Sequence, residues 1–97
     1  MFLESELPYG WHLLSKNESA VMEVELARET CNSHILHKMN ANAIAKRIGA
    51  DDFLFSLEKG DSYLVVVSLT WKSETHPHLP DFKVFDDKKD FLIEYKN

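Results

Sequence analysis

Two runs of aromatic and β-branched residues near the middle of the chain constrain its fold most strongly. They read DFLFSLE over residues 52–58 and SYLVVVSLTW over residues 62–71, and a short segment around Gly60 separates them. Side chains of these types fit the pleated, half-buried surface of a sheet, and a glycine between two such runs is typical of a tight turn. The sequence therefore predicts an antiparallel hairpin.

The alternation of side chains along the two strands predicts their register. The bulky residues at odd positions in 53–57 belong on one face, because a shift of one residue would move all of them to the other face. They oppose the odd positions in 63–67 only if odd residues pair with odd residues, which needs a loop with an odd number of residues. Residues 59–61 supply such a loop, with Gly60 or Asp61 in the positive-φ conformation that it requires.

A capping box predicts a helix in the first third of the chain. Ser15 and Glu18 stand at the spacing that satisfies free backbone N–H groups at a helix start, so we expect a helix over about residues 18–30. One face of this helix gathers apolar residues, namely Met22, Leu26, Ala27, Ala20, Cys31 and Val24. The opposite face gathers charged residues, namely Glu18, Glu25, Arg28 and Glu29. Glu23 falls within the apolar face, either at its edge with the carboxylate in water or half-buried and aimed at a site.

Other segments complete the predicted fold. The segment ELPYGW reads as a turn, and residues 41–48, although compatible with a helix, are taken as a strand because they are few. Residues 82–85 predict a short edge strand, after which Asp86 caps a final helix that extends to about Tyr95. The apolar side chains of this helix dock on the sheet, namely Phe91, Leu92 and Tyr95.

The predicted elements amount to one α+β domain over residues 1–97. It consists of an antiparallel meander sheet of three to four strands, with an N-terminal and a C-terminal helix packed beside it. A chain of 97 residues with 44% hydrophobic and 28% charged side chains suits a single core.

The charge and the cysteine content restrict the partners and the compartment. A net charge of −5 argues against a nucleic-acid surface, and it suits either a soluble protein or one that meets a basic partner. The single cysteine, Cys31, cannot form an intramolecular disulfide, and no apolar run has the length of a signal peptide or a membrane span. We therefore expect a cytoplasmic protein that binds neither nucleic acid nor membrane.

Three short motifs stand out along the chain, namely an LPxGW start over residues 7–11, an ExELxxE helix over residues 23–29 and an LTW…E..P..P strand end over residues 69–80. Together they resemble the motifs of a small, widespread family of bacterial proteins with no known activity. Further matching residues lie between them, namely His34, Leu36, Ala45, Arg47, Asp51, Asp52, Leu54 and Phe55. The chain departs from the pattern at Ser68 and Leu79, where the family has histidine and tryptophan. The resemblance spans about residues 7–85 and implies a single-domain bacterial protein, but no particular activity.

The spacing of Cys31, His34 and His37 is the most metal-like feature, and His76 and His78 could add ligands from a second segment. Zinc takes three or four such ligands in a tetrahedron, usually as closely spaced pairs from two segments. The first three residues match no standard structural pattern and no second cysteine is present, so we expect no bound metal. In that interpretation Cys31 is a small buried hydrophobic residue.

Signatures of catalysis are also missing. The chain has no GxSxG elbow and no glycine-rich phosphate loop, because its three glycines are far apart. Asp51 and Asp52 could form an acid–base pair, but they more simply mark the turn into a strand. We therefore expect neither catalytic residues nor a cofactor.

Residues 69–80, LTWKSETHPHLP, are the strongest candidate for a binding surface. Trp71 continues the odd-numbered apolar positions, so we expect its indole to cover the end of the core and its N–H to find an acceptor in Glu74 or a loop carbonyl. The same segment could instead be a site, because aromatic, acidic and imidazole groups meet on a loop beside a rigid sheet. The candidate binding residues are Trp71, Glu74, His76, His34 and Glu29.

These patterns predict a small non-enzymatic interaction module, such as an inhibitor or an immunity-like protein. It would bind a protein partner through its acidic helix face and residues 69–80, and a homodimer is also compatible with the sequence. The alternative is a small-molecule or metal-binding domain, or a weak hydrolase, that uses Trp71, Glu74, His34 and His76. Convergence of those four side chains on one cleft would favour the alternative, and a flat surface would favour the module.

Overall fold

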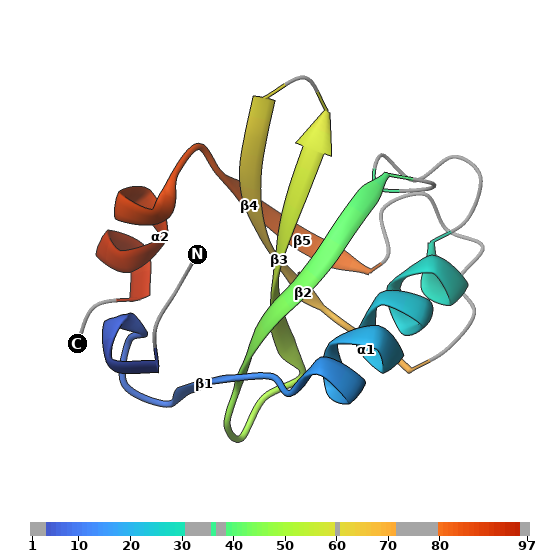
Figure 1. The fold of residues 1–97 in the computed structure, drawn as a ribbon, viewed down its shortest axis with the longest axis horizontal. Coiled ribbons are helices and arrows are strands. Elements are labelled where there is room, and N and C mark those ends of the chain that lie inside the picture. Colours follow the sequence, from blue (N-terminus) through green and yellow to red (C-terminus); the bar gives the residue numbers. More distant parts are fainter. Residues whose placement is uncertain (1–3, 31–35, 37–38, 60, 72–79, 96–97) are drawn as a thin grey trace.

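Two α-helices and five strands make up most of the described chain, and the longest links join α1 to β2 and β4 to β5 (Figure 1). The computed structural model describes residues 4–30, 36, 39–59, 61–71 and 80–95. Its elements in chain order are η1 (Glu4–Glu6), β1 (Trp11–Leu13), α1 (Lys16–Glu29), β2 (Asn40–Arg47), β3 (Asp52–Lys59), β4 (Asp61–Ser68), β5 (Asp81–Phe85) and α2 (Lys88–Tyr95). Neither α1 nor α2 combines the length and the apolar character that a membrane-crossing helix needs.

The strands form one antiparallel sheet whose spatial order follows the chain. In the described residues the sheet has five strands in the order β1-β2-β3-β4-β5, which confirms the α+β class and the meander. The predicted number of strands was too low, because β1 occupies part of the segment ELPYGW that we read as a turn. Its three residues are too few to show an alternating pattern, and their pairing with β2 defines the strand, with Trp11 opposite Arg47 and Leu13 opposite Ala45.

The central hairpin has the predicted register. Phe55 lies opposite Val65, and odd residues pair with odd residues along all of β3 and β4. The strands extend further than expected, to a pair between Lys59 and Asp61, so the connection is shorter than three residues; Gly60 lies outside the described residues. At its other end β4 stops at Ser68.

Each face of the sheet carries its own core, and one helix covers each face (Figure 1). One face carries the odd-numbered residues of β3 and β4 and packs against Leu26 of α1. Its buried residues include Phe53, Phe55, Leu57, Val65, Val67 and Leu69. The other face carries the even-numbered residues of β3 and β4 and packs against Phe91 of α2. Its buried residues include Leu54 and Val66 from these strands, Trp11 from β1 and Phe85 from β5. The molecule therefore has three layers, with the sheet in the middle.

A β-bulge in β2 lets this strand serve both cores. Ala43 pairs with Phe55 and Ala45 pairs with Leu54, so Ile44 is the extra residue between them. As a result Ala43 faces the core beneath α1, whereas Ala45 faces the core beneath α2.

The C-terminal helix begins one residue later than predicted. The Asp87 carboxylate accepts a hydrogen bond from the Asp90 amide at 2.9 Å, so Asp87 rather than Asp86 caps α2. A carboxylate at this position satisfies a backbone N–H that has no partner within the helix. The predicted docking of α2 is confirmed, because Phe91 is fully buried and the half-buried Leu92 and Tyr95 pack against the same core.

The N-terminal helix has the predicted cap but a different orientation. The Ser15 hydroxyl accepts from the Glu18 amide at 3.1 Å, and the Glu18 carboxylate accepts from the Ser15 amide at 3.0 Å, which confirms the capping box. Of the predicted apolar face, Leu26 is buried and Met22 is half-buried, but Ala20, Val24 and Ala27 are exposed. The predicted division into a buried apolar face and an exposed acidic face is therefore wrong for α1. The contacts of its carboxylates, described below, explain why.

Candidate functional site

The structure describes two of the five predicted binding residues, Glu29 and Trp71. The other three, His34, Glu74 and His76, lie outside the described residues, as do the metal-ligand candidates Cys31, His37 and His78. Convergence of Trp71, Glu74, His34 and His76 on one cleft, the criterion for the alternative function, is therefore untested. The site is built here from Glu29 and Trp71 outward.

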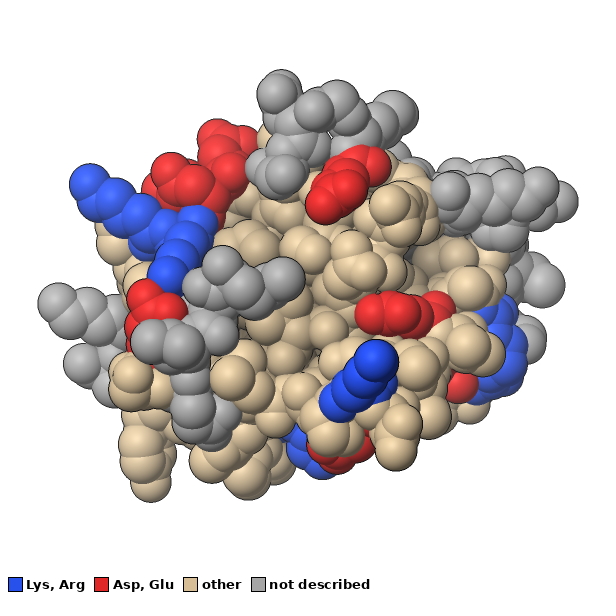
Figure 2. All heavy atoms as spheres, in the orientation of Figure 1, with Lys and Arg blue, Asp and Glu red and all other residues tan. Residues whose placement is uncertain are grey.

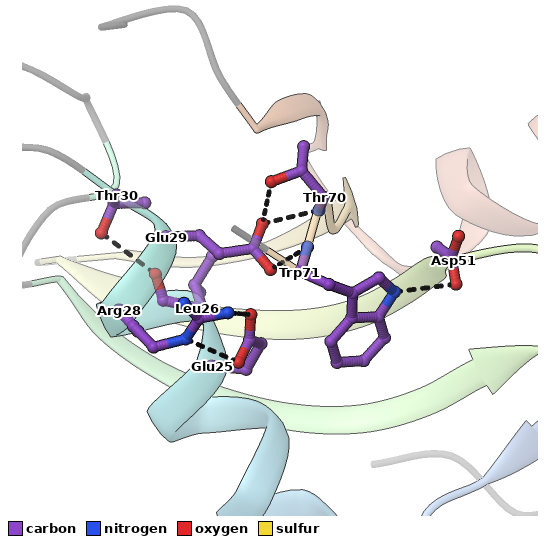
Figure 3. Close-up of polar contacts among 8 residues, drawn as sticks. All are labelled: Glu25, Leu26, Arg28, Glu29, Thr30, Asp51, Thr70 and Trp71. Atoms are coloured by element: carbon purple, nitrogen blue, oxygen red, sulfur yellow. Dashed lines mark hydrogen bonds and ion pairs between the residues drawn. The ribbon is translucent and has the colours of Figure 1, made fainter. Parts of the chain in front are cut away.

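Glu29 joins the end of α1 to the chain after β4 (Figure 3). Its side chain is fully buried, with 0% exposure. The Thr70 amide donates to Oε1 at 2.7 Å, the Thr70 hydroxyl donates to Oε1 at 3.0 Å, and the Trp71 amide donates to Oε2 at 2.8 Å. A buried carboxylate is stable only when donors surround it in this way. Glu29, which we placed on the exposed face of the helix, is thus a structural residue that fixes residues 70–71.

A second carboxylate of α1 stands next to Glu29. Burial raises the pKa of Glu29, and a hydrogen bond with the Glu25 carboxyl raises it further. The pKa of Glu25 is lowered, chiefly by its hydrogen bonds from Arg28, whose Nε donates to Glu25 Oε1 at 3.0 Å. The two carboxyls therefore differ: Glu25 stays ionised in an ion pair with Arg28, and Glu29 holds a proton more readily than an ordinary glutamate.

Trp71 adopts a backbone conformation that is rare for a bulky residue. Its φ of +62° lies in the left-handed region, where an L-residue brings its Cβ too close to the backbone, at a cost of about 1 kcal/mol. Such a conformation persists only where the surroundings determine it, and the Glu29 carboxylate does so by accepting from the amides of Thr70 and Trp71. The alternation of side chains that runs along β4 and continues to the buried Leu69 therefore ends there.

This turn places the Trp71 indole at the surface rather than over the core. The residue is 45% exposed, so the predicted core lid is wrong. Its ring packs edge-on against Phe53 with 5.9 Å between ring centroids, and Nε1 donates to Asp51 Oδ1 at 3.0 Å (Figure 3). The acceptor is thus a carboxylate at the start of β3, and not the predicted loop group.

A groove of about 330 Å³ lies between Trp71 and the N-terminal half of α1. Its lining is apolar along Leu14, Val21, Met22, Ala50, Phe53 and Trp71. Its polar lining residues are Asn17, Glu18, Lys46 and Asp51. Among the described residues that line the groove, Trp71 alone was singled out from the sequence as a binding residue, because the others come from segments that the fold brings together.

The exposed side of α1 next to this groove carries several apolar residues, together with the exposed Lys16, Asn17 and Arg28. Val21 and Val24 are 58% and 69% exposed, and Ala20 and Ala27 are exposed beside them. We call these four residues the α1 apolar strip; Val21 belongs both to the strip and to the groove. Figure 2 shows the molecule from the side of Figure 1, where residues other than Lys, Arg, Asp and Glu cover most of the surface and separate charged side chains lie both at the edges and inside the outline.

The acids of α1 are engaged within the protein, which explains why the valines point outward. Glu23 is half-buried, and its Oε2 accepts from the Ala43 amide at the β-bulge at 2.9 Å, so its carboxylate binds the sheet and is not turned wholly to water. Glu29 binds residues 70–71, as described, and Glu25 pairs with Arg28. Because of these contacts, α1 is oriented with the α1 apolar strip toward solvent. The acidic residues of the predicted binding face are not exposed together.

The described residues offer little for a metal or for acid–base catalysis. Among them no group of three His, Cys, Asp or Glu side chains could hold a metal ion. Asp51 accepts from Trp71, and Asp52 accepts from the Ser68 hydroxyl at 2.6 Å and lies 3.5 Å from Arg47. Both aspartates thus have structural partners at the entrance to β3.

Comparisons with family models, with curated proteins and with solved structures found no match to this chain. The resemblance to a bacterial family accordingly stays a prediction. The case for a function rests on the groove and the α1 apolar strip.

Proposed function

We propose that this protein is a small non-enzymatic interaction module that binds a partner protein through the α1 apolar strip and the adjoining groove. The observation that carries the proposal is the orientation of α1. A surface helix normally turns apolar residues inward and charged residues outward, whereas α1 turns Glu23 and Glu29 to the sheet and Val21 and Val24 to solvent.

The spacing of the strip suits a helix-mediated interface. Ala20, Val24 and Ala27 recur at intervals of four and three residues, which brings them onto one side of the helix, and Val21 extends this side toward the groove. Partners that bind a helix commonly read anchors at this spacing. Single exposed apolar residues are ordinary on a protein surface, but a contiguous set beside a groove marks an interaction site. An inhibitor or an immunity-like protein would use such a surface.

Affinity capture from the native cells tests the proposal. Tagged wild-type chain should retain a defined partner in a stable ratio, and Val24→Lys should lose it, because a charge in the middle of the strip opposes burial of the interface. Ile93→Lys is the matched control, since Ile93 of α2 is 63% exposed and lies in the other helical layer. Retention of the partner by Val24→Lys, or equal loss in the Ile93→Lys variant, would contradict the proposal.

A small-molecule-binding domain is the second candidate, and the groove favours it. Its volume of about 330 Å³ lies at the lower end of the range for ligand pockets, roughly 300–1,000 Å³. A metal site or a weak hydrolase that uses His34, Glu74 and His76 beside Trp71 remains a prediction. If zinc is part of such a site, chelator treatment should lower the melting temperature and added zinc should restore it. The interaction module predicts the same melting temperature with and without chelator.

A further inference from the structure

We infer that the groove beside Trp71 receives a basic side chain, arginine or lysine, from the partner protein. The inference rests on the proposed interaction module and names the chemistry of its partner. It is carried by three properties of the groove: an apolar lining of suitable shape, an excess of carboxylates at its rim and an indole that the fold holds in a fixed position.

The apolar lining suits the aliphatic stem of a long basic side chain. Met22, Phe53 and Trp71 line the groove together, and the Trp71 indole is about half exposed. Arginine and lysine commonly lay their methylene groups along such surfaces while their charged ends reach polar groups. A guanidinium or ammonium near the face of a tryptophan is also attracted by the negative charge above the ring. An uncharged apolar side chain would use the first of these interactions only.

The polar lining favours a positive charge. Glu18 and Asp51 contribute two carboxylates and Lys46 contributes one ammonium, and the whole chain carries a net charge of −5. Each carboxylate uses one oxygen internally, Glu18 Oε1 for the Ser15 amide and Asp51 Oδ1 for the Trp71 indole. An ionised carboxylate has a second oxygen that can accept from a ligand. Hydrogen bonds from Ser15 lower the pKa of Glu18, so this carboxylate is charged at neutral pH.

Lys46 carries the one opposing charge among the described residues that line the groove. It makes no ion pair within the described part of the chain, although its charge adds to the lowering of the Glu18 pKa. Its ammonium would repel a basic ligand and attract an acidic one. Removal of the Lys46 charge should therefore strengthen the binding of a basic ligand and weaken the binding of an acidic ligand. This difference makes the inference testable.

The groove is also formed before binding. Glu29 fixes the backbone of residues 70–71, and Asp51 holds the indole N–H at 3.0 Å, so the ring has a defined position without a ligand. A site that is ordered in advance loses less conformational freedom on binding. This fixed indole also provides a spectroscopic probe at the site itself.

The test is an NMR titration of the ¹⁵N-labelled full chain with three blocked tripeptides, Gly-Arg-Gly, Gly-citrulline-Gly and Gly-Glu-Gly. The readout is the indole N–H of Trp71, and the indole N–H of Trp11, which is 3% exposed and lies in the core beneath α2, is the internal control. We expect the arginine peptide to shift the Trp71 signal with a Kd of about 1–10 mM, as for a single anchoring side chain. The neutral citrulline peptide should bind about threefold to tenfold more weakly.

Charge variants that keep the local structure sharpen the titration. Asp51→Asn retains an oxygen acceptor for the indole, and Glu18→Gln retains the capping box, so both remove charge without removing the internal contact. Each should weaken arginine binding about twofold to fivefold, and Lys46→Gln should strengthen it by a similar factor. Equal binding of arginine and citrulline, preferential binding of glutamate, weaker arginine binding in Lys46→Gln, or no Trp71 shift at about 10 mM peptide would each overturn the inference.

The outcomes separate this inference from the proposed function. Loss of partner capture in Val24→Lys together with an unresponsive Trp71 would reject the basic anchor and leave the interaction module standing. A specific Trp71 response to arginine with unchanged partner capture in Val24→Lys would support the site and reject the α1 apolar strip as the docking surface.

Discussion

The two helices are attached to the sheet by different kinds of contact. On the α2 side, Phe91 is fully buried, and its ring meets Trp11 and Phe85 edge-on with centroids 5.3 Å and 5.8 Å apart. On the α1 side, Leu26 is the only buried apolar residue of the helix, and the carboxylate of Glu29 reaches backbone amides across the interface. One helix is thus held by buried area, and the other largely by directed hydrogen bonds.

The difference teaches what each kind of contact determines. Apolar burial contributes free energy in proportion to area and depends little on direction. A hydrogen bond contributes less net free energy, but it is costly to leave unmade and it fixes the position of both partners. We therefore expect the α2 side to dominate the stability of the protein and the α1 side to dominate the geometry of the groove.

The largest effect should come from the α2 side. Phe91→Ala removes the side chain at the centre of the aromatic cluster and should lower the free energy of unfolding by about 3–5 kcal/mol. Urea denaturation measures this loss, and Ile93→Ala in the exposed part of the same helix is the control, with an expected change of about 0.5 kcal/mol or less. A small effect of Phe91→Ala would contradict the assignment of stability to this side.

Removal of the buried carboxylate should have the next largest effect. Glu29→Ala leaves the amides of Thr70 and Trp71 without their acceptor, which should cost about 2–4 kcal/mol. The indole N–H signal of Trp71 should also shift, because the backbone is no longer held in the left-handed region. Glu29→Gln keeps one acceptor oxygen, so its free energy of unfolding should lie between those of the wild-type protein and Glu29→Ala. An unchanged Trp71 signal in Glu29→Ala would show that Glu29 does not position the groove.

Truncation of the indole should cost less than either change. Trp71→Ala loses the edge-on contact with Phe53 and the bond to Asp51, and with the side chain about half exposed we expect about 1–2 kcal/mol. Partner binding should nevertheless fall strongly, because the groove loses its aromatic side. A stability loss of about 3–5 kcal/mol would instead restore the view of Trp71 as a core residue.

The smallest effect concerns pH. The pKa of Glu29 is raised above its ordinary value of 4.5, so the folded state binds a proton more tightly than the unfolded state does. The stabilising contribution of this proton is complete below pH 4.5 and disappears as the pH rises through the folded-state pKa. As the pH rises from 4.5 through the folded-state pKa of Glu29, the free energy of unfolding of the wild-type protein should therefore fall by about 1 kcal/mol or less relative to that of Glu29→Gln. Urea denaturation at several pH values measures this change. A free energy of unfolding that rises with pH in the wild-type protein relative to Glu29→Gln would contradict the raised pKa of Glu29.

The elements that sequence predicts well are those whose signal is local and repeated. The odd positions around Phe55 and Val65 alternate over several residues, and this alternation was enough for the hairpin and its register. The capping box of Ser15 with Glu18 was likewise complete within four residues of sequence. By contrast β1 has no pattern of its own and exists because β2 offers it a neighbour.

The candidate site was less predictable, because its causes are distant in the chain. Glu29 looks like one more acid on a charged helix face, and its burial follows from two amides that lie 41 and 42 residues further along. Trp71 seemed to continue the apolar positions of β4 until those same bonds turned the chain away. The choice of residues 69–80 as a binding surface stays a prediction, since residues 72–79 lie outside the described residues. The exposed face of α1 was assigned the wrong polarity, because the distant bonds of Glu29 set the orientation of the helix.

The meander order of the sheet has a consequence for how the chain reaches its native state. Each strand finds its partner in the next strand, and short loops join β2, β3 and β4, so the sheet can begin at these three strands, which favours fast folding. The links from β1 to β2 and from β4 to β5 are longer, because they contain α1 and residues 69–80. The contact between Glu29 and residues 70–71 closes a much longer loop, and the bond from Lys88 to Glu6 joins groups 82 residues apart. We expect these two closures to form after the rate-limiting step. Substitutions of Glu29 should then accelerate unfolding while leaving the refolding rate nearly unchanged, so the groove would be the last part of the molecule to assemble and the first to open.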